Sequence, residues 1–172
     1  SLSVQAQCNC DHTIPFSEQV IFDGAQENVM PGDTICVEAG ITRDKLHFRN
    51  IVGTPEAPVV IINCGGQVVI QGTGSGGSNV PLALNGNRYF HLTGTGDPAY
   101  EYGFKAGGET HATVEGQGRA TNFELDHIEV FSAGFAGFML KTDPDGSGNN
   151  ARPNSPGAIN GGFTMYDISV HD

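Results

Sequence analysis

The sequence predicts an all-β parallel solenoid, and three observations lead to that fold class. Short runs rich in β-branched residues alternate with Gly, Pro and Asn corners between residues 29 and 70, a pattern that indicates strands rather than helices. Glycine accounts for 25 of the 172 residues, which is typical of turn-rich β folds. The short runs recur at intervals of roughly 34–36 residues, which fits solenoid turns of three strands each.

The first residues of the chain are typical of the end of a signal peptide. Val4 and Ala6 occupy the small-residue positions that precede a cleavage site. We therefore expect residues 1–6 to be a signal remnant and residues 7–172 to form one domain, secreted or held at the cell surface. An ordinary frayed terminus is the alternative interpretation. Residues 7–30 are expected to cap the first coil, because terminal repeats of solenoids are atypical.

Four cysteines fall within the first 64 residues. In an exported chain their even number predicts one or two disulfides that fasten the N-terminal cap. Three pairings are possible, and the sequence does not choose among them. A zinc site is disfavoured, since a C-x-C pair followed by two isolated cysteines has no familiar ligand spacing. The cysteines are Cys8, Cys10, Cys36 and Cys64.

Three columns of stacked strands are expected from residue 34 onward. The clearest internal match aligns Phe123–Val130 with Phe163–Val170, where apolar residues fall at identical offsets. A propeller is the main alternative for repeating strands, and it would need tight hairpins between them. The first column is expected to hold Thr34–Val37, Val68–Ile70, Tyr102–Lys105 and Phe138–Lys141; the second Val59, Tyr89, Phe123 and Phe163; the third Leu46–Phe48, Leu82–Leu84 and Thr113–Glu115.

Two polar stretches interrupt the regular pattern, at residues 72–81 and 142–162. The second is long and rich in Asp and Asn, and long insertions in solenoids often carry function. The chain finishes at His171 and Asp172, in the middle of an expected coil. The sequence therefore predicts either a fragment of a longer protein or an exposed end that stacks on another chain, as in a structural or adhesive module that assembles end to end.

Three segments carry a resemblance to a known family: PGDTICVEAG, NIVGTPEAPVVIINCGGQVVI and HIEVFSAGFAGFMLKTDP. They resemble the opening coils of secreted right-handed parallel β-helix proteins of the pectate-lyase-like superfamily, in particular exported proteins of Bacteroidetes-type bacteria. The resemblance implies a right-handed parallel β-helix of about four to five coils. It also implies an extracellular protein that binds or processes a polysaccharide or surface glycan, as a lyase or a glycoside hydrolase. Such relatives are usually several coils longer, so the resemblance leaves open whether this chain holds a complete active site.

Charge narrows the classes of partner. The net charge is −11, from 19 acidic and 8 basic residues, so no basic patch is available for nucleic acid. The same excess of carboxylates favours divalent cations. No apolar run reaches the roughly 18 residues that a membrane-spanning helix requires.

A calcium site is predicted in the second polar stretch. Oxygen-bearing side chains alternate there at every second position, with Gly148 where a calcium loop turns sharply. Asn154 stands where a bidentate Glu would be expected, and a metal-free surface turn is the alternative interpretation. The predicted ligands are Asp143, Asp145, Ser147 and Asn149.

The candidate catalytic residues are the few basic residues of the expected coils. A uronate lyase needs a base for the α-proton and a cation or Arg that neutralises the substrate carboxylate. Lys105 and Lys141 are expected in one column, with Lys141 beside the predicted calcium loop, and Arg119 is the third candidate. Ordinary solvent-facing side chains are the alternative interpretation.

Asp126, His127 and Asp167 are the candidate substrate-binding residues. A glycoside hydrolase needs two carboxylates about 5–10 Å apart, and rows on adjacent coils lie about 4.8 Å apart. Within the repeat, however, Asp126 aligns with Tyr166 and His127 with Asp167, which weakens a carboxylate pair. His91, His127 and His171 recur near one column and are interpreted as structural or surface histidines.

Overall fold

The computed structural model describes residues 8–15, 21–73, 80–108, 111–118, 120–140 and 163–171. These ranges hold fourteen β-strands, and they contain no helix. All of the strand pairings are parallel, in two sheets. The predicted all-β class with parallel strands is therefore confirmed.

The first sheet is built around β12 (Thr121–Phe131), its longest strand. The first half of β12 pairs with β9 (Arg88–Thr93), and its second half pairs with β10 (Phe104–Gly107). The strand order is β1-β3-β6-β9-β12-β10-β7-β4, and β14 (Phe163–His171) also pairs with β12. The remaining strands are β1 (His12–Ile14), β3 (Thr34–Glu38), β4 (Thr42–Arg43), β6 (Val59–Cys64) and β7 (Val68–Gln71).

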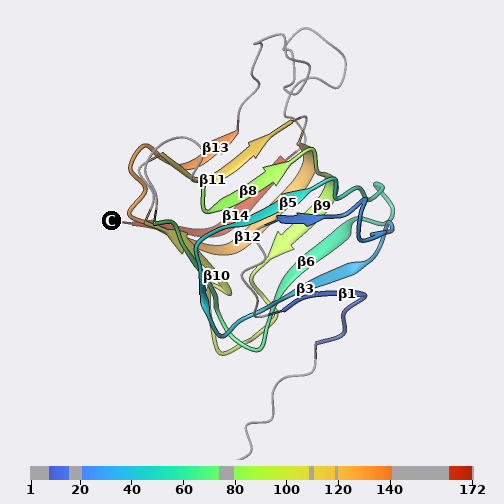
Figure 1. Cartoon of the computed structure of the whole chain (residues 1–172), viewed down its shortest axis with the longest axis horizontal. Helices are drawn as coiled ribbons and strands as arrows, with labels where there is room; N and C mark the ends of the chain where they lie inside the picture. The colour runs from blue at the N-terminus through green and yellow to red at the C-terminus, as the bar shows by residue number, and fades with distance from the viewer. Residues whose placement is uncertain are drawn as a thin grey trace, which may run out of the picture.

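The second sheet has the order β13-β11-β8-β5-β2. Its strands are β2 (Ile21–Asp23), β5 (Leu46–Arg49), β8 (Leu82–Asn85), β11 (Ala112–Gln117) and β13 (Ala136–Leu140). Figure 1 shows β5, β8, β11 and β13 following one another across this sheet, while β3, β6, β9 and β12 do so in the first. Strands distant in the sequence therefore lie side by side.

One hydrophobic core fills the space between the two sheets. Ile61 and Leu92 of the first sheet and Phe48 and Leu84 of the second belong to a single cluster of fully buried side chains. The alternation along β6 explains how this arises, since Val59, Ile61 and Asn63 are buried while the residues between them are half-buried. Successive side chains of a strand point to opposite faces, so every second residue faces the core.

Stacking in register extends the core from one strand to the next. Phe90 of β9 lies opposite Val59 of β6 on one side and Phe123 of β12 on the other. The rings of Phe90 and Phe123 stack with their centroids 5.1 Å apart. Aromatic pairs at this spacing add to the stability that burial provides. The same internal face is therefore continued by equivalent residues on neighbouring strands.

The strands of the second and third expected columns pair in the structure, but one member of each column is out of register by one residue. Phe123 lies opposite Phe163 and Leu46 opposite Leu82 as expected, whereas Val59 lies opposite Phe90 rather than Tyr89, and Leu82 lies opposite Val114 rather than Thr113. The first column was wrong. Its members lie at three different places: Thr34 opposite Val60, Val68 opposite Phe104, and Phe138 opposite Val114.

Two disulfides fasten the segment that precedes β1. Cys8 is bonded to Cys64 at the end of β6, and Cys10 is bonded to Cys36 in β3. The predicted disulfides are confirmed, and the structure selects one of the three pairings. Such bonds are typical of chains that fold in an oxidising compartment. In the part of the chain described, no helix is long and apolar enough to cross a membrane.

Candidate functional site

The half-buried face of β6, β9 and β12 carries the polar residues that form the candidate site. His91 of β9 is in register with Val60 of β6 and with Glu124 of β12. Two residues further along, Thr93 is in register with Asp126. The alternation of a parallel sheet turns these residues away from the core, so they form two adjacent rows on the outer face.

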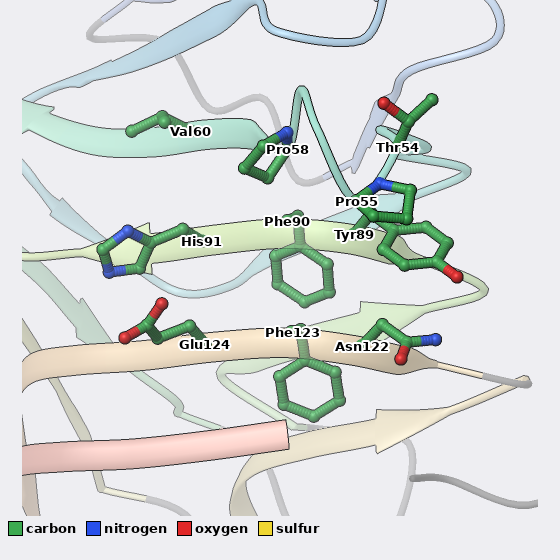
Figure 2. A pocket seen from close by; sticks show the side chains of 10 residues that line it. All are labelled: Thr54, Pro55, Pro58, Val60, Tyr89, Phe90, His91, Asn122, Phe123 and Glu124. Atoms are coloured by element: carbon green, nitrogen blue, oxygen red, sulfur yellow. The ribbon is translucent and has the colours of Figure 1, made fainter. Parts of the chain in front are cut away.

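An open groove lies over the first of these rows (Figure 2). Its volume is about 350 Å³, within the range of small-molecule binding sites. The groove is bounded by the connection between β5 and β6 and by the outer faces of β6, β9 and β12. The lining residues are Thr54, Pro55, Pro58, Val60, Tyr89, Phe90, His91, Asn122, Phe123 and Glu124.

Tyr89 and Asn122 occupy equivalent positions at one end of the groove. Both have a left-handed backbone, with φ of 51° for Tyr89 and 52° for Asn122. The residues on either side of them are paired between β9 and β12. Asn adopts this conformation readily, whereas a bulky residue such as Tyr rarely does. Figure 2 shows the Tyr89 ring beside Pro55 and the Asn122 amide on the adjacent strand. Strained backbone of this kind clusters at functional sites.

Asp126 is the centre of a buried polar cluster in the second row. Its side chain is only 1% exposed, although it points to the outer face. One carboxylate oxygen is bonded to Thr93 Oγ1 at 2.6 Å and to His127 Nδ1 at 2.5 Å. The other oxygen is bonded to His91 Nε2. Thr95 Oγ1 lies 3.0 Å from the Thr93 hydroxyl, so this hydroxyl joins a chain of donors that ends at the carboxylate.

The hydrogen bonds keep Asp126 ionised. Burial raises the pKa of this carboxyl, but the hydrogen bonds from Thr93, His91 and His127 together outweigh that effect, so the pKa lies below its ordinary value. An ionised carboxylate can only accept hydrogen bonds. Both bonded ring nitrogens must therefore carry the hydrogen, which leaves the second nitrogen of each neutral imidazole with a lone pair.

The local fold explains why His127 reaches the carboxylate of the residue before it. His127 has φ of 51° and stands where β12 bends, between the halves that pair with β9 and β10. Gly94 packs against this bend, because a Cβ on Gly94 would lie 2.1 Å from the His127 carbonyl oxygen. The Gly94 amide also donates to the carbonyl of Asp126, at 3.1 Å. The close packing and the hydrogen bond of Gly94 therefore fix the backbone of β12 at this bend.

The structure brings two of the predicted substrate-binding residues together, Asp126 and His127. The third, Asp167, lies in β14 between Tyr166, which is opposite Asp126, and Ile168, which is opposite Ile128. The expected alignment of Asp126 with Tyr166 is thus confirmed. Asp126 itself is covered by its partners, while His91 and His127 are partly exposed, so the histidines and not the carboxylate are open to solvent on this face.

Lys105 lies on β10, away from the cluster. Its ammonium is 2.8 Å from Glu129 Oε1 and 5.1 Å from the centroid of the Phe131 ring. These are the contacts of a charged ammonium, which has no lone pair with which to take up a proton. The geometry of Lys105 therefore supports a structural ion pair between β10 and β12 more than it supports a catalytic base.

The remaining predicted residues fall outside the described ranges. They are Arg119, Lys141, Asp143, Asp145, Ser147 and Asn149, so the lysine–calcium arrangement stays a prediction. Among the residues that the structure describes, no group of three or more His, Cys, Asp or Glu side chains is arranged to hold a metal ion. The calcium prediction therefore depends on residues 143–149 alone.

Sequence reasoning did not find the roles of His91 and Thr93. The aromatic residues Phe90 and Phe123 could have supplied the signal, because aligning them places His91 opposite Glu124 and Thr93 opposite Asp126. His91 was interpreted as a structural or surface histidine. Its contact with Asp126 and its place in the groove assign it to the candidate site.

Comparison with known proteins adds no relative. No family model, no curated protein and no solved structure matches the chain. The resemblance to the pectate-lyase-like superfamily therefore rests on the sequence segments quoted above.

Proposed function

We propose that the chain is a right-handed parallel β-helix from an extracellular protein and that its outer groove binds a polysaccharide. The pairings support the fold, since β3, β4 and β5 are followed by β6, β7 and β8 and then by β9, β10 and β11, each strand parallel to its predecessor. Three strands per turn are expected of a solenoid. Right-handedness follows from the strong preference of parallel crossovers for that hand.

The groove over β6, β9 and β12 is the observation that carries the functional proposal. It is open, and it combines the Tyr89 ring with polar groups from His91, Asn122 and Glu124. A sugar presents apolar ring faces and hydroxyl edges, so a binding site needs an aromatic surface and both donors and acceptors beside it. The groove crosses strands about 4.8 Å apart, a spacing comparable to the length of one sugar unit.

Charge favours a neutral polysaccharide over a polyuronate. The chain carries a net charge of −11, and Glu124 adds a carboxylate to the groove itself. A long-range field of this sign repels anionic chains at low ionic strength. Polyuronates would bind here only with divalent cations between the two surfaces, which is where the predicted calcium loop would matter.

Binding to a panel of polysaccharides tests the proposal. Neutral chains such as xylan, mannan and β-glucan, and anionic chains such as alginate and polygalacturonate, are titrated by calorimetry with and without calcium. Tyr89→Ala and Asn122→Ala are expected to weaken binding to the preferred chain at least about ten-fold, or about 1.4 kcal/mol. Neither side chain belongs to the buried core. Because both positions have a left-handed backbone, which alanine tolerates poorly, thermal unfolding checks that each variant is folded.

Tyr100→Ala is the matched control. Tyr100 is an exposed tyrosine, with 44% of its surface accessible, and it lies in a different hollow beside Gly66 and Gln67. Its loss should leave the affinity unchanged. If no polysaccharide binds, or if Tyr100→Ala weakens binding as much as Tyr89→Ala does, the groove is not the binding site.

A further inference from the structure

We propose that the Asp126 cluster is a catalytic acid–base site that hydrolyses an ester substituent on the polysaccharide in the groove. The cluster consists of Asp126, His91 and His127, with Thr93 and Thr95 as supporting hydroxyls. The choice of a polymeric substrate rests on the proposed function. The ester chemistry itself does not, because it can be assayed on a small ester that needs no groove.

The two histidines have the orientation that acid–base catalysis requires. His127 gives its Nδ1 hydrogen to Asp126, at 2.5 Å, and this leaves Nε2 with the lone pair of a general base. His91 gives its Nε2 hydrogen to the other oxygen of the same carboxylate. Holding the tautomer of an imidazole with a buried carboxylate is the role that aspartate plays in hydrolytic triads.

Both rings are accessible to a substrate, although the carboxylate is not. The side chains of His91 and His127 are 26% and 29% exposed, against 1% for Asp126. His91 also lines the groove, in register with Glu124. A ligand that occupies the groove therefore reaches the His91 imidazole directly. The His127 imidazole lies on the other side of the Asp126 carboxylate.

The charges of the cluster allow an acid and a base to coexist. When one of the two imidazoles carries an additional proton, its positive charge balances the negative charge of the Asp126 carboxylate. The cluster is then neutral overall, with one protonated ring and one neutral ring. A protonated His91 retains its hydrogen bond to Asp126 and gains a second N–H donor at Nδ1. His127 then acts as the base, and His91 supplies the donor for a developing oxyanion.

Ester hydrolysis fits these groups better than cleavage of the polysaccharide backbone does. Hydrolysis of a glycosidic bond uses two carboxylates. The Asp126 carboxylate is covered by three hydrogen bonds, which leaves Glu124 as the one carboxylate among the described residues that line the groove. Elimination from a uronate would bring an anionic substrate to a protein of net charge −11. A neutral ester needs one base, one oxyanion donor and water.

The reaction balances with these groups alone. Nε2 of His127 takes a proton from water while the water oxygen bonds to the ester carbonyl carbon, and the carbonyl electron pair moves to its oxygen. The N–H of His91 donates to that oxyanion. The bond between the carbonyl carbon and the sugar oxygen then breaks, and the departing oxygen takes the proton from His127. The products are a carboxylic acid and a free sugar hydroxyl, and the cluster returns to its starting state.

The test measures acetate released from an acetylated neutral polysaccharide, and in parallel the hydrolysis of 4-nitrophenyl acetate. His127→Asn is the main variant, because Asn tolerates the left-handed backbone at φ of 51°. Its activity on both esters should fall at least about a hundred-fold, the scale of a lost general base. Thermal unfolding checks that each variant is folded.

Asp126→Asn tests the positioning role of the carboxylate. It keeps both imidazoles but no longer fixes their tautomers, so kcat should fall with little change in KM, and the pH at which the rate rises should shift. A purely structural role would not move the pH profile of a folded variant. An unchanged profile with unchanged kcat would refute the role assigned to Asp126.

His12→Ala is the matched control for the histidines. His12 also contacts an aspartate, with its Nε2 2.9 Å from Asp33 Oδ2, and its side chain is 19% exposed. Its removal should not change either rate. Equal losses in His12→Ala and His127→Asn, or a wild-type rate no higher than that of free imidazole at equal concentration, would overturn the proposal.

Failure of the groove and failure of the acid–base site give different results. If both are correct, acetate is released from the polysaccharide that binds, and Tyr89→Ala weakens both the binding and this release. If the groove is wrong but the cluster is catalytic, the small ester is hydrolysed while no polysaccharide binds. If polysaccharide binds and neither ester is hydrolysed, the proposed function stands and the acid–base site is rejected.

Discussion

Asp126 combines features that rarely occur together in one side chain. It occupies an outward position of β12 and is nevertheless buried, with partners on both of its oxygens. Burying an ionised carboxylate is costly unless hydrogen bonds replace the lost water. Thr93, His91 and His127 supply those bonds, so the cluster is held in one arrangement rather than being an incidental surface contact.

The lowered pKa of Asp126 makes a part of the folding stability depend on pH. Because its pKa in the folded chain is below the unfolded value of about 3.9, the carboxylate stabilises the fold above that pH. This contribution is lost as the pH falls through the unfolded value toward the folded one. At pH 7, Asp126→Asn is expected to lower the free energy of unfolding by about 1–3 kcal/mol, and the difference from the wild type should narrow below about pH 4.

Denaturant unfolding at several pH values measures this difference. Glu56→Gln is the control, since Glu56 is exposed in the connection between β5 and β6 and its loss should change stability little at any pH. The wild type alone is not diagnostic, because hydrogen bonds also lower the pKa of Asp33 and of Asp44. A difference between the wild type and Asp126→Asn that stays constant down to pH 3 would contradict the assignment.

At the residue scale, the sequence predicted a part of the site. Asp126 and His127 were selected because they lie in a repeat, and the structure places them in contact. Their relation to His91 and Thr93 was missed, since it depends on register between strands more than thirty residues apart. A single sequence indicates that strands stack, but the exact register comes from packing of core residues such as Phe90 against Phe123.

At the element scale, the connections between strands decide which residues meet. The connection from β6 to β7 covers residues 65–67, whereas that from β9 to β10 covers residues 94–103. The longer connection carries Thr95 to the Asp126 cluster. Its path is set by close packing, because a Cβ on Gly96 would lie 1.8 Å from the Asn63 carbonyl oxygen, and the Gly96 amide donates to Asn63 Oδ1 at 2.8 Å.

Gly94→Ala tests whether the β9–β10 connection positions His127. The new methyl group would meet the His127 carbonyl oxygen at 2.1 Å and the Gly103 amide nitrogen at 2.6 Å, so the bend of β12 must move. Overpacking of this kind is expected to destabilise the fold by about 1–3 kcal/mol. It should also reduce ester hydrolysis more than it reduces polysaccharide binding, because Tyr89 and Asn122 lie at the other end of the groove.

Gly32→Ala separates contact from backbone strain. Gly32 has φ of 90°. The atom nearest to a Cβ added at this position would be Ala57 Cβ, at 3.6 Å, which is an ordinary van der Waals distance. This variant should lose stability through its backbone conformation alone and retain full ester hydrolysis. Equal effects of the two variants on hydrolysis would mean that the rate follows global stability rather than the position of His127.

The unequal connections also explain the error in the first expected column. The prediction assumed that strands separated by a constant number of residues occupy the same position in successive turns of the solenoid. Thr34–Val37 was therefore aligned with Val68–Ile70. The short β4 intervenes after β3 and pairs with β7, while Thr34 lies opposite Val60. Where the sequence itself has an aromatic residue at the start of both strands, as with Phe123 and Phe163, the predicted alignment was right.

At the scale of the whole molecule, the fold class follows from composition and the pattern of short runs. Parallel strands in two sheets around one core account for the abundance of β-branched residues and of glycine at the corners. The disulfide pairing could not be predicted, since it depends on how the segment before β1 crosses the sheet. That segment runs beside β3, whose Ile35 lies opposite His12, and this brings Cys10 near Cys36 and Cys8 near Cys64.

The two disulfides should contribute nearly equally to stability, although they close loops of different size. Cys8–Cys64 spans a sequence separation of 56 residues and Cys10–Cys36 one of 26. Loop-closure entropy gives about 4 kcal/mol for the longer loop and about 3.5 kcal/mol for the shorter one. Cys36 is fully buried in β3, however, so its replacement by Ala adds a cavity cost of about 1 kcal/mol that offsets the smaller loop.

Guanidinium unfolding of the two double-alanine variants measures these contributions. Each pair should lower the free energy of unfolding by about 3–5 kcal/mol, with a difference between the pairs of less than about 1 kcal/mol. Reduction of the wild type should cost more than either double variant, because it opens both loops at once. A loss confined to the Cys10–Cys36 variant would mean that the segment around Cys8 adds nothing to the stability of the fold. The two bonds would then have unequal roles, with the shorter one alone holding the first strand against β3.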